Sequence, residues 1–417
     1  MLAPFYTKLF LLALFVKSLI ESYLDKRNLD HIIKNQNQVP ERFKNIISLE
    51  EHQKAAEYSI AKIKSAQIFH FINLIIFIVL TLGGGIELLT RLSMNFGQSD
   101  KISGLYFFLF LGVATSILGL PEQIYYTFFL EEKFGFNKTT VKTFIIDMIK
   151  GGLLAIILGG PIAYVILTIM DNLSTYWWLY AFLFLTVVQL LLVFIYPTLI
   201  APLFNKFTPI PEGTTKTIIE NLLDRVGFKS KGIFIMDASK RSGHGNAYFT
   251  GFGKNKRIVF FDTLIKTLED AEIEAVLAHE LGHMKKNHII KAMIKGIFFS
   301  FIGFYLLGVL KNNSAFFNGH GITTLTNANI LTLFSMVAGT YTFLMTPISA
   351  YLSRKNEYEA DEFAATHASA AKLISALVKM YNDNKSFLVP DPIYSKFYYS
   401  HPPAIERVKF LEKFTLS

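Results

Sequence analysis

Residues 275–288 read AVLAHELGHMKKNH, and two histidines in this stretch stand four residues apart with a glutamate directly after the first. Residues four apart lie on the same face of a helix, so His279 and His283 can direct both imidazoles at one metal ion. Glu280 then projects beside that ion, where it can act as a general base. A catalytic zinc site has three protein ligands and one open position. The pattern therefore predicts a zinc-dependent hydrolase whose third ligand lies elsewhere in the chain.

The best candidate for the third ligand lies in SRKNEYEADEFA, residues 353–364. Glu357 and Asp361 are four residues apart on a predicted helix, so one can bind the metal while the other accepts a hydrogen bond from the outer nitrogen of a ligand histidine. Glu359 and Glu362 face away from that pair. The alternative is a solvated, charged helix end. We favour the ligand because the predicted topology, given below, brings this stretch and HELGH to one edge of the membrane.

Such a site predicts peptide hydrolysis without a covalent intermediate. The metal would lower the pKa of its bound water to about 7, and Glu280 would take the proton as the water attacks a polarised carbonyl. Replacing Glu280 with glutamine should preserve metal binding and abolish turnover. The chain has no cysteine, which excludes thiolate ligands, a cysteine nucleophile and disulfides. Two histidines and a carboxylate suit zinc, although cobalt and manganese also accept this donor set.

The composition is typical of a membrane protein. Of the 417 residues, 52% are hydrophobic and only 18% are charged. Seven stretches have the roughly twenty apolar residues that a membrane-spanning helix needs. They are residues 4–23, 67–90, 103–130, 152–171, 176–205, 289–310 and 329–352. The first has no small-residue cleavage site after it, so we interpret it as an anchor and not as a removed signal peptide.

The charges between these segments predict their orientation. The net charge is +9, and lysine and arginine gather in the first, third and fifth connections, whereas the fourth connection, DNLST, has none. The positive-inside rule places the basic connections and the C-terminus in the cytoplasm and the N-terminus outside. The sixth segment starts after His288 and the seventh ends near Arg354, so HELGH and the 353–364 helix meet at the cytoplasmic face. We expect no nucleic-acid partner, because basic residues beside membrane segments explain the charge.

Residues 206–288 form a small soluble unit by the same analysis. NAYFTGFGKNKRIVFFDTL is typical of a β-hairpin with GFGKNK at its turn, and TLEDAEIEAVLAHELGHMKKNH is typical of one helix. We therefore expect four regions. They are five membrane segments in 1–205, a metalloprotease region in 206–288, two further membrane segments in 289–352, and a C-terminal cytoplasmic region in 353–417 that supplies the third ligand.

In sequence order, five stretches resemble the type I CaaX prenyl endopeptidases, which are membrane zinc metalloproteases that remove the last three residues of prenylated proteins. The stretches are EEKFGFNKTT (131–140), SGHGNAYFTGFGKNKRIVFFDTL (242–264), HELGH (279–283), NEYEAD (356–361) and YSHPPAIER (399–407). The resemblance covers nearly the whole chain. It implies a mostly α-helical polytopic membrane protein, in which seven transmembrane helices form a barrel around a chamber that a small α+β zinc metalloprotease domain caps.

The resemblance also assigns residues to roles. It implies one zinc ion per chain on His279, His283 and Glu357, with Glu280 as the base and Asp361 as the carboxylate behind a ligand. It implies that the substrate backbone lies along an edge strand, a binding mode known as β-addition, and that the oxyanion is stabilised or the substrate gripped by two further residues. The edge-strand residues are Asn246, Ala247, Tyr248 and Phe249, and the two further residues are His401 and Arg407. The expected partners are C-terminal peptide segments, prenylated or not, and the lipid bilayer.

Two other functions remain open at this point. One is a quality-control membrane metalloprotease of broader specificity, which dependence of cleavage on a prenyl group would distinguish. The other is a non-catalytic chamber that binds lipids or chains, for which Glu280 would be dispensable. The C-terminal KFTLS carries no lysine-based retrieval signal, so we expect the bacterial inner membrane, or the endoplasmic reticulum membrane in a eukaryote. The oligomeric state stays undetermined.

Overall fold

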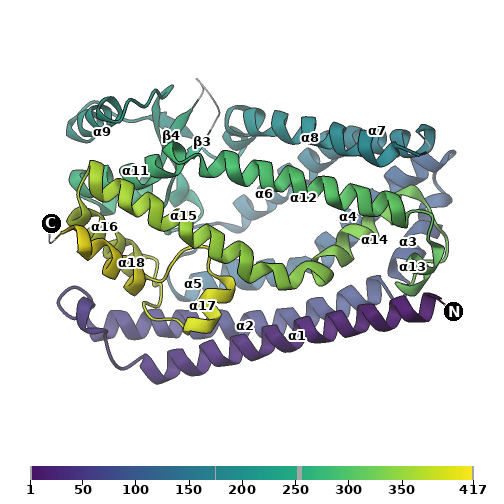
Figure 1. Ribbon diagram of the computed structural model, residues 1–417, viewed down its shortest axis with the longest axis horizontal. Coiled ribbons are helices and arrows are strands. Elements are labelled where there is room, and N and C mark those ends of the chain that lie inside the picture. Colours follow the sequence, from purple (N-terminus) through teal and green to yellow (C-terminus); the bar gives the residue numbers. More distant parts are fainter. Residues whose placement is uncertain (1, 174, 251–255, 416–417) are drawn as a thin grey trace.

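The computed structural model describes residues 2–173, 175–250 and 256–415. The molecule is elongated, with the N-terminus at one end and the C-terminus at the other (Figure 1). Long helices run along most of its length, and a small sheet with short helices lies at the C-terminal end. The first helices are α1 (Leu2–Asn35), α2 (Leu49–Leu80), α3 (Gly85–Met94), α4 (Asp100–Tyr125), α5 (Glu131–Lys133), α6 (Val141–Leu154), α7 (Gly160–Asn172) and α8 (Trp177–Ile195).

The remaining helices belong to the C-terminal half, where two long ones continue into the membrane part. They are α9 (Thr214–Arg225), α10 (Asp262–Thr267), α11 (Asp270–Lys285), α12 (His288–Leu310), α13 (Ser314–Gly319), α14 (Asn327–Thr342), α15 (Thr346–His367), α16 (Ala370–Asp383), α17 (Pro392–Tyr398) and α18 (Ala404–Leu411). Short π-helical and 3-10 turns join several of these helices, including η2 (Tyr126–Leu130), η4 (Tyr196–Ile200) and η8 (Phe343–Met345).

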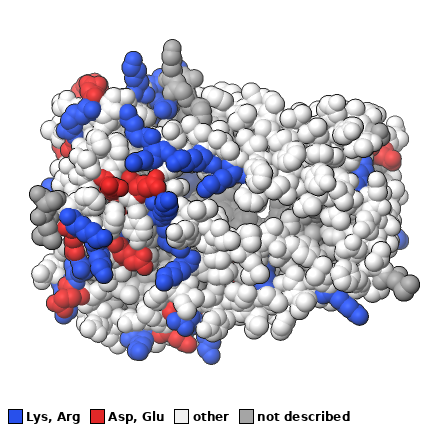
Figure 2. Space-filling view, viewed as in Figure 1, with Lys and Arg blue, Asp and Glu red and all other residues white. Residues whose placement is uncertain are grey.

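Within the described ranges, seven helices are long and apolar enough to cross a membrane. They are Leu2–Asn35, Leu49–Leu80, Asp100–Lys133, Val141–Asn172, Trp177–Leu203, His288–Leu310 and Asn327–His367. Each exceeds the roughly twenty residues that a bilayer requires. Figure 2 shows that acidic and basic side chains gather at the C-terminal end of the molecule, while most of the remaining visible surface carries neither. The predicted mostly helical, seven-helix membrane protein with a small sheet domain is confirmed.

One predicted segment is interrupted. The sequence suggested a single span over residues 67–90, but α2 ends at Leu80 and α3 begins at Gly85. The break falls in the GGG sequence at 83–85, where Gly84 adopts a φ of 80°. Residues with a side chain rarely adopt this left-handed conformation, and a glycine adopts it at little cost. The chain therefore turns at Gly84 and does not continue as one helix.

The soluble end is built on a small sheet. Four strands occur in the described residues, in the order β1–β2–β4–β3, with β2 and β4 parallel and the other pairs antiparallel. They are β1 (Phe207–Pro209), β2 (Ile233–Met236), β3 (Ala247–Thr250) and β4 (Arg257–Phe261). The predicted hairpin is confirmed in its strands, because Ala247 pairs with Phe260 and Thr250 with Arg257. Most of its turn, residues 251–255, lies outside the described residues. β3 occupies the edge of the sheet.

Helix α11 forms the centre of this domain. A capping box closes its start, with reciprocal hydrogen bonds between Glu269 and Glu272. Nine of its sixteen residues are buried, including Ile273, Leu277 and Leu281, which is the pattern of a helix surrounded by protein. The sequence suggested that this helix continues to His288. It ends instead at Lys285, and α12 begins at His288.

α11 packs very closely against α15. A Cβ atom added at Gly282, in the middle of HELGH, would lie 2.9 Å from the Cα atom of Ala360 and 3.1 Å from its carbonyl oxygen. A real side chain does not fit at that distance from a neighbouring backbone. Gly282, which lies between the two histidines in the sequence, thus allows α15, with Glu357, to approach α11, with His279 and His283.

Candidate metal centre and active site

The side chains of His279, His283 and Glu357 converge on one point. The Nε2 atoms of the two histidines lie 3.2 Å apart. Glu357 Oε2 lies 3.5 Å from His279 Nε2, and Glu357 Oε1 lies 3.3 Å from His283 Nε2. α11 supplies the two histidines and α15 supplies the carboxylate. These three residues form the group that could hold a metal ion among the described residues.

The donor atoms suit zinc in both spacing and chemistry. Ligand atoms about 2.0–2.1 Å from one ion in tetrahedral geometry lie roughly 3.3 Å from each other, close to the separations given above. Glu357 Oε2 is buried, and in the part of the chain that the structure describes it has no hydrogen-bond partner. A buried carboxylate oxygen without a partner is costly unless a cation or donor joins it. The residues present therefore fit a zinc ion.

Behind His279 lies a buried ion pair. The Nδ1 atom of His279 is 2.9 Å from Asp361 Oδ1, so the imidazole ring directs its Nε2 atom at the metal position. Arg407 donates to both oxygens of Asp361, from Nε at 2.9 Å and from Nη2 at 2.5 Å. Burial and Arg407 lower the pKa of His279, but its hydrogen bonds with Asp361 and Glu357 outweigh them and raise it to about 9. The ring thus exchanges a proton for a metal ion in a strongly anionic environment.

This arrangement refines the expected part of Arg407. The residues Asp361 and Arg407 are both buried, and the guanidinium points two of its donors at Asp361. Its Nη1 lies 3.9 Å from Glu357 Oε2. The geometry favours a residue that holds Asp361 in place over one that grips the substrate, and the oxyanion role of Arg407 stays a prediction.

His283 has its own support, which sequence reasoning missed. Its Nδ1 lies 3.0 Å from Nδ1 of His288, and His288 Nε2 lies 3.1 Å from Glu359 Oε2. Glu359, which we expected to face away from Glu357 and Asp361, contacts this buried histidine. The signal that could have found His288 is the asparagine before it, since Asn287 has a φ of 58°. Asparagine tolerates this conformation better than most residues, and the turn brings His288 back toward His283.

Glu280 lies beside the metal position in a cavity of about 300 Å³. The same cavity is lined by His283, Glu357 and the edge-strand residues Tyr248 and Phe249. Burial raises the pKa of Glu280 despite the opposing influence of the two neighbouring histidines. A carboxylate with a raised pKa accepts a proton more readily, which is the property that a general base needs.

The predicted edge-strand residues lie where a peptide could pair with them. Ala247, Tyr248 and Phe249 belong to β3, and Asn246 precedes it and accepts a hydrogen bond from the backbone N–H of Phe261. Ala247 is buried, while the outer edge of β3 pairs with no other described strand. The strand and Glu280 line one cavity, as β-addition requires.

His401 reaches the centre from the C-terminal segment. Its Nε2 lies 3.4 Å from Glu357 Oε1, although the side chain is 63% exposed. Ser400 Oγ lies 2.9 Å from its other ring nitrogen. An exposed ring beside the metal position is available to a substrate, which distinguishes His401 from the buried Arg407.

Comparison with known proteins identifies the family to which the chain belongs. Residues 28–206 match the family described as CAAX prenyl protease N-terminal, five membrane helices, and residues 209–415 match peptidase family M48. The chain is 37% identical to CAAX prenyl protease 1 of Saccharomyces cerevisiae, over 94% of this chain and 92% of the relative. It is 36% identical to the CAAX prenyl protease 1 homolog of Arabidopsis thaliana, over 95% of each chain.

The fold has a solved counterpart. The crystal structure of Ste24p from S. mikatae matches with a TM-score of 0.90 and 36% identity, and the match covers 97% of this chain and 98% of that chain. The likeness extends over the membrane helices and the soluble domain together, so the expected chamber-forming architecture is confirmed. This chain belongs to the CAAX prenyl protease 1 family and is a multi-pass membrane metallopeptidase of family M48.

Proposed function

We propose that the protein is a zinc-dependent endopeptidase that removes the C-terminal tripeptide of prenylated CaaX-type proteins. The observation that carries the proposal is the convergence of His279, His283 and Glu357 beside Glu280 and a free edge strand. A site that only stabilised the fold would have no use for Glu280 in the same cavity. The family name of the relatives supports the substrate class.

The residues of the site divide the tasks of this reaction among them. When bound, zinc supplies Lewis-acid chemistry, which activates water and polarises the scissile carbonyl. Glu280 accepts a proton from the attacking water and delivers it to the leaving amine. His401 donates a hydrogen bond toward the oxygen that gains negative charge. Asp361 orients His279, and Arg407 neutralises and holds Asp361.

The substrate backbone pairs with β3, so binding depends little on side-chain sequence. An apolar cavity of about 730 Å³ lies at the far end of that strand. Phe249 and Thr250 border it together with membrane-helix residues such as Leu185, Val188 and Leu192. This lining has the chemistry of a site for a prenyl chain.

The site faces the cytoplasm in this proposal, because the basic connections gather at the end of the molecule that carries the sheet. The relatives reported above come from yeasts and a plant and lend no support to the expected bacterial inner membrane. We retain the four regions with boundaries at residues 205, 288 and 352. The metal centre joins the second region to the fourth.

The test is hydrolysis of a farnesylated CaaX peptide and of its unprenylated twin by detergent-purified protein. Wild type should cut the farnesylated peptide, and Glu280→Gln should bind one zinc per chain and cut neither peptide. A strong preference for the farnesylated peptide supports the proposal. If wild type holds one zinc yet cuts neither peptide, the assignment is wrong, and if it cuts both equally, a broader quality-control protease is the better description.

A further inference from the structure

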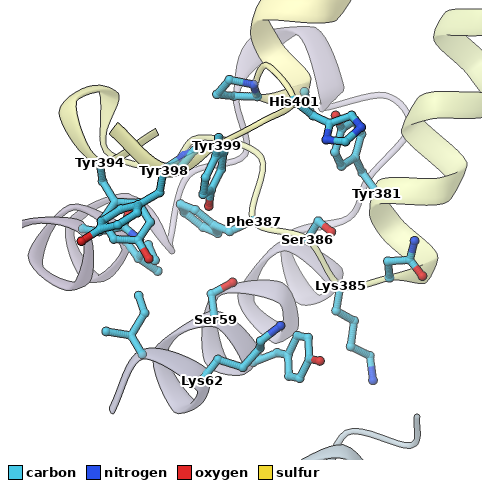
Figure 3. Close-up of a pocket in the computed structure, with 18 of the residues that line it drawn as sticks. Ser59, Lys62, Tyr381, Lys385, Ser386, Phe387, Tyr394, Tyr398, Tyr399 and His401 are labelled. Atoms are coloured by element: carbon cyan, nitrogen blue, oxygen red, sulfur yellow. The ribbon is translucent and has the colours of Figure 1, made fainter. Parts of the chain in front are cut away.

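A second large cavity lies near the metal centre, in addition to the apolar cavity bordered by Phe249 and Thr250. It measures about 730 Å³ and lies between α1, α2 and the segments that follow α16 (Figure 3). His401 lines it, and His401 also lies 3.4 Å from Glu357, so one end of the cavity reaches the metal centre. Tyrosine side chains cover much of its wall, including Tyr398 and Tyr399.

Lys62 lies across this cavity from His401. In Figure 3 its side chain rises from α2 toward the segment that carries Ser386 and Phe387. The ammonium lies 5.1 Å from the centre of the Tyr58 ring, and among the described residues it forms no ion pair. Lys385 also lines the cavity, but its ammonium extends away from His401 and donates to the carbonyl oxygen of Phe134. Lys62 is therefore the cation available to an anionic ligand here.

The two nearby carboxylates, Glu131 and Asp25, interact with other residues and leave Lys62 available to an anionic ligand. Glu131 interacts electrostatically with Lys62, but Tyr58 donates to its Oε1 at 2.6 Å and His244 lies 3.2 Å from its Oε2. Asp25, which also lines the cavity, lies close enough to Tyr394 to influence its ionisation. Figure 3 places Tyr394 apart from Lys62, at the side of the cavity beneath α17.

The two large cavities lie at opposite ends of β3. His244, two residues before Asn246, lines the cavity with Lys62, whereas Phe249 and Thr250 line the apolar cavity. The smaller cavity with Glu280 lies between them and shares Phe249 with the apolar one. A CaaX substrate has the same order of groups, with its lipid before the scissile bond and its free carboxylate three residues after it.

We propose that Lys62 binds the C-terminal carboxylate of the substrate and thereby fixes its direction along β3. This inference rests on the proposed function. The substrate runs antiparallel to β3, the commoner strand pairing, with its lipid-bearing residue toward Phe249 and its last residue beside Lys62. Three extended residues span roughly 10 Å, so the carboxylate is carried past His401 into the cavity. The position of Lys62 in the cavity thus favours substrates that have three residues after the scissile bond.

The test compares a farnesylated CaaX peptide that ends in a free carboxylate with the same peptide ending in an amide. Wild type should cleave the acid with a kcat/KM roughly ten times that of the amide, because a hydrogen bond to a charged group contributes that much or more. Lys62→Met should lower kcat/KM for the acid to the value for the amide and leave the amide unchanged. Lys62→Arg should retain most of the preference.

Lys64→Met is the matched control. Lys64 is an exposed lysine on the same helix, and two residues rotate the side chain by about 200°, so it leaves the cavity lining. This variant should behave as wild type with both peptides. A preference for the acid that survives in Lys62→Met, or that Lys64→Met loses equally, overturns the proposal.

A binding measurement separates this proposal from the proposed function. In the Glu280→Gln background, the released tripeptide should bind more tightly as a free acid than as an amide, and Lys62→Met should remove that difference. Calorimetry measures this without turnover. If no peptide is cut but the acid preference and its loss are observed, the proposed reaction is wrong and the carboxylate site stands. Equal binding of acid and amide overturns the carboxylate site alone.

Discussion

The contact chain from His283 to Glu359 should determine zinc affinity. His283 Nδ1 meets only His288, at 3.0 Å, and His288 meets Glu359 at 3.1 Å, among the hydrogen bonds of the described residues. Loss of a partner behind a ligand typically weakens metal binding 10–100-fold, or roughly 1.4–2.7 kcal/mol. His288→Ala removes the whole support and should reach the upper part of that range. Glu359→Gln keeps an acceptor oxygen and should lose about tenfold at most.

The arrangement also predicts how the effects combine. Glu359 acts on His283 only through His288, so the double variant should bind zinc no more weakly than His288→Ala alone. Asp361 supports the other ligand histidine, so Asp361→Asn combined with His288→Ala should weaken zinc binding more than His288→Ala alone.

The assay is titration of metal-free, detergent-purified protein with zinc against a competing fluorescent chelator. His367→Ala is the control, because His367 is exposed and lies on the same helix as Glu359, stacked on Phe363 with ring centres 4.0 Å apart. The unfolding temperature of each metal-free variant separates a local effect from a loss of fold. Unchanged zinc affinity in a folded His288→Ala protein contradicts the reasoning, and so does full additivity of His288→Ala and Glu359→Gln.

Three further predictions concern the metal and the soluble domain. A strong chelator should abolish peptidase activity, and one equivalent of zinc should restore it, as activity assays before and after dialysis would measure. Gly282→Ala should lower the unfolding temperature and weaken zinc binding, because its methyl group would meet the Ala360 backbone at 2.9 Å; wild-type values would show that the helices separate freely. Burial raises the pKa of Glu272, but hydrogen bonds from Lys379 and Ser375 outweigh it and hold the pKa below its ordinary value. The Glu272–Lys379 ion pair therefore stabilises the fold fully at pH values above about 4.3, the pKa of Glu272 in the unfolded chain. This stabilisation is lost as the pH falls below that value toward the lower pKa of the folded state. Lys379→Met should lower the unfolding temperature at pH 7 and approach wild type near pH 3, and a constant difference would contradict this.

The membrane part and the core of the site could be predicted because each depends on a local pattern. Apolar length alone identifies a membrane-spanning helix, and the spacing of His279 and His283 fixes their common face. The helical spacing and the orientation rule predict a metal ligand at Glu357 or Asp361, and the family resemblance assigns it to Glu357. Their roles in catalysis stay predictions, but the structure brings their donor atoms to within 4.8 Å of each other.

The features that escaped prediction depend on single backbone angles. A continuous helix would place His288 on a different face from His283, five residues earlier, and the left-handed turn at Asn287 reverses this. Gly84 likewise ends a span that apolar composition would have continued. Glycine and asparagine permit such angles without requiring them, and hydrophobic periodicity does not encode them.

The proposed carboxylate site escaped prediction for a different reason. Lys62 and His401 are separated by more than three hundred residues, and Lys62 belongs to no recognisable pattern. Only the packing of α2 against the segments after α16 brings them to one cavity. A single sequence contains no signal for that pairing.

The start of α12 connects the metal centre to the thickness of the bilayer. α12 has 23 residues, which at about 1.5 Å per residue gives a length of roughly 35 Å, a few ångströms more than a typical hydrocarbon core of about 30 Å. A helix longer than the core tilts, and the tilt changes with the acyl chains around it. His288 is the first residue of α12, so a change in this tilt would move the partner of His283. We therefore expect lipids of different chain length to change the contact between His288 and His283, whichever substrate is bound.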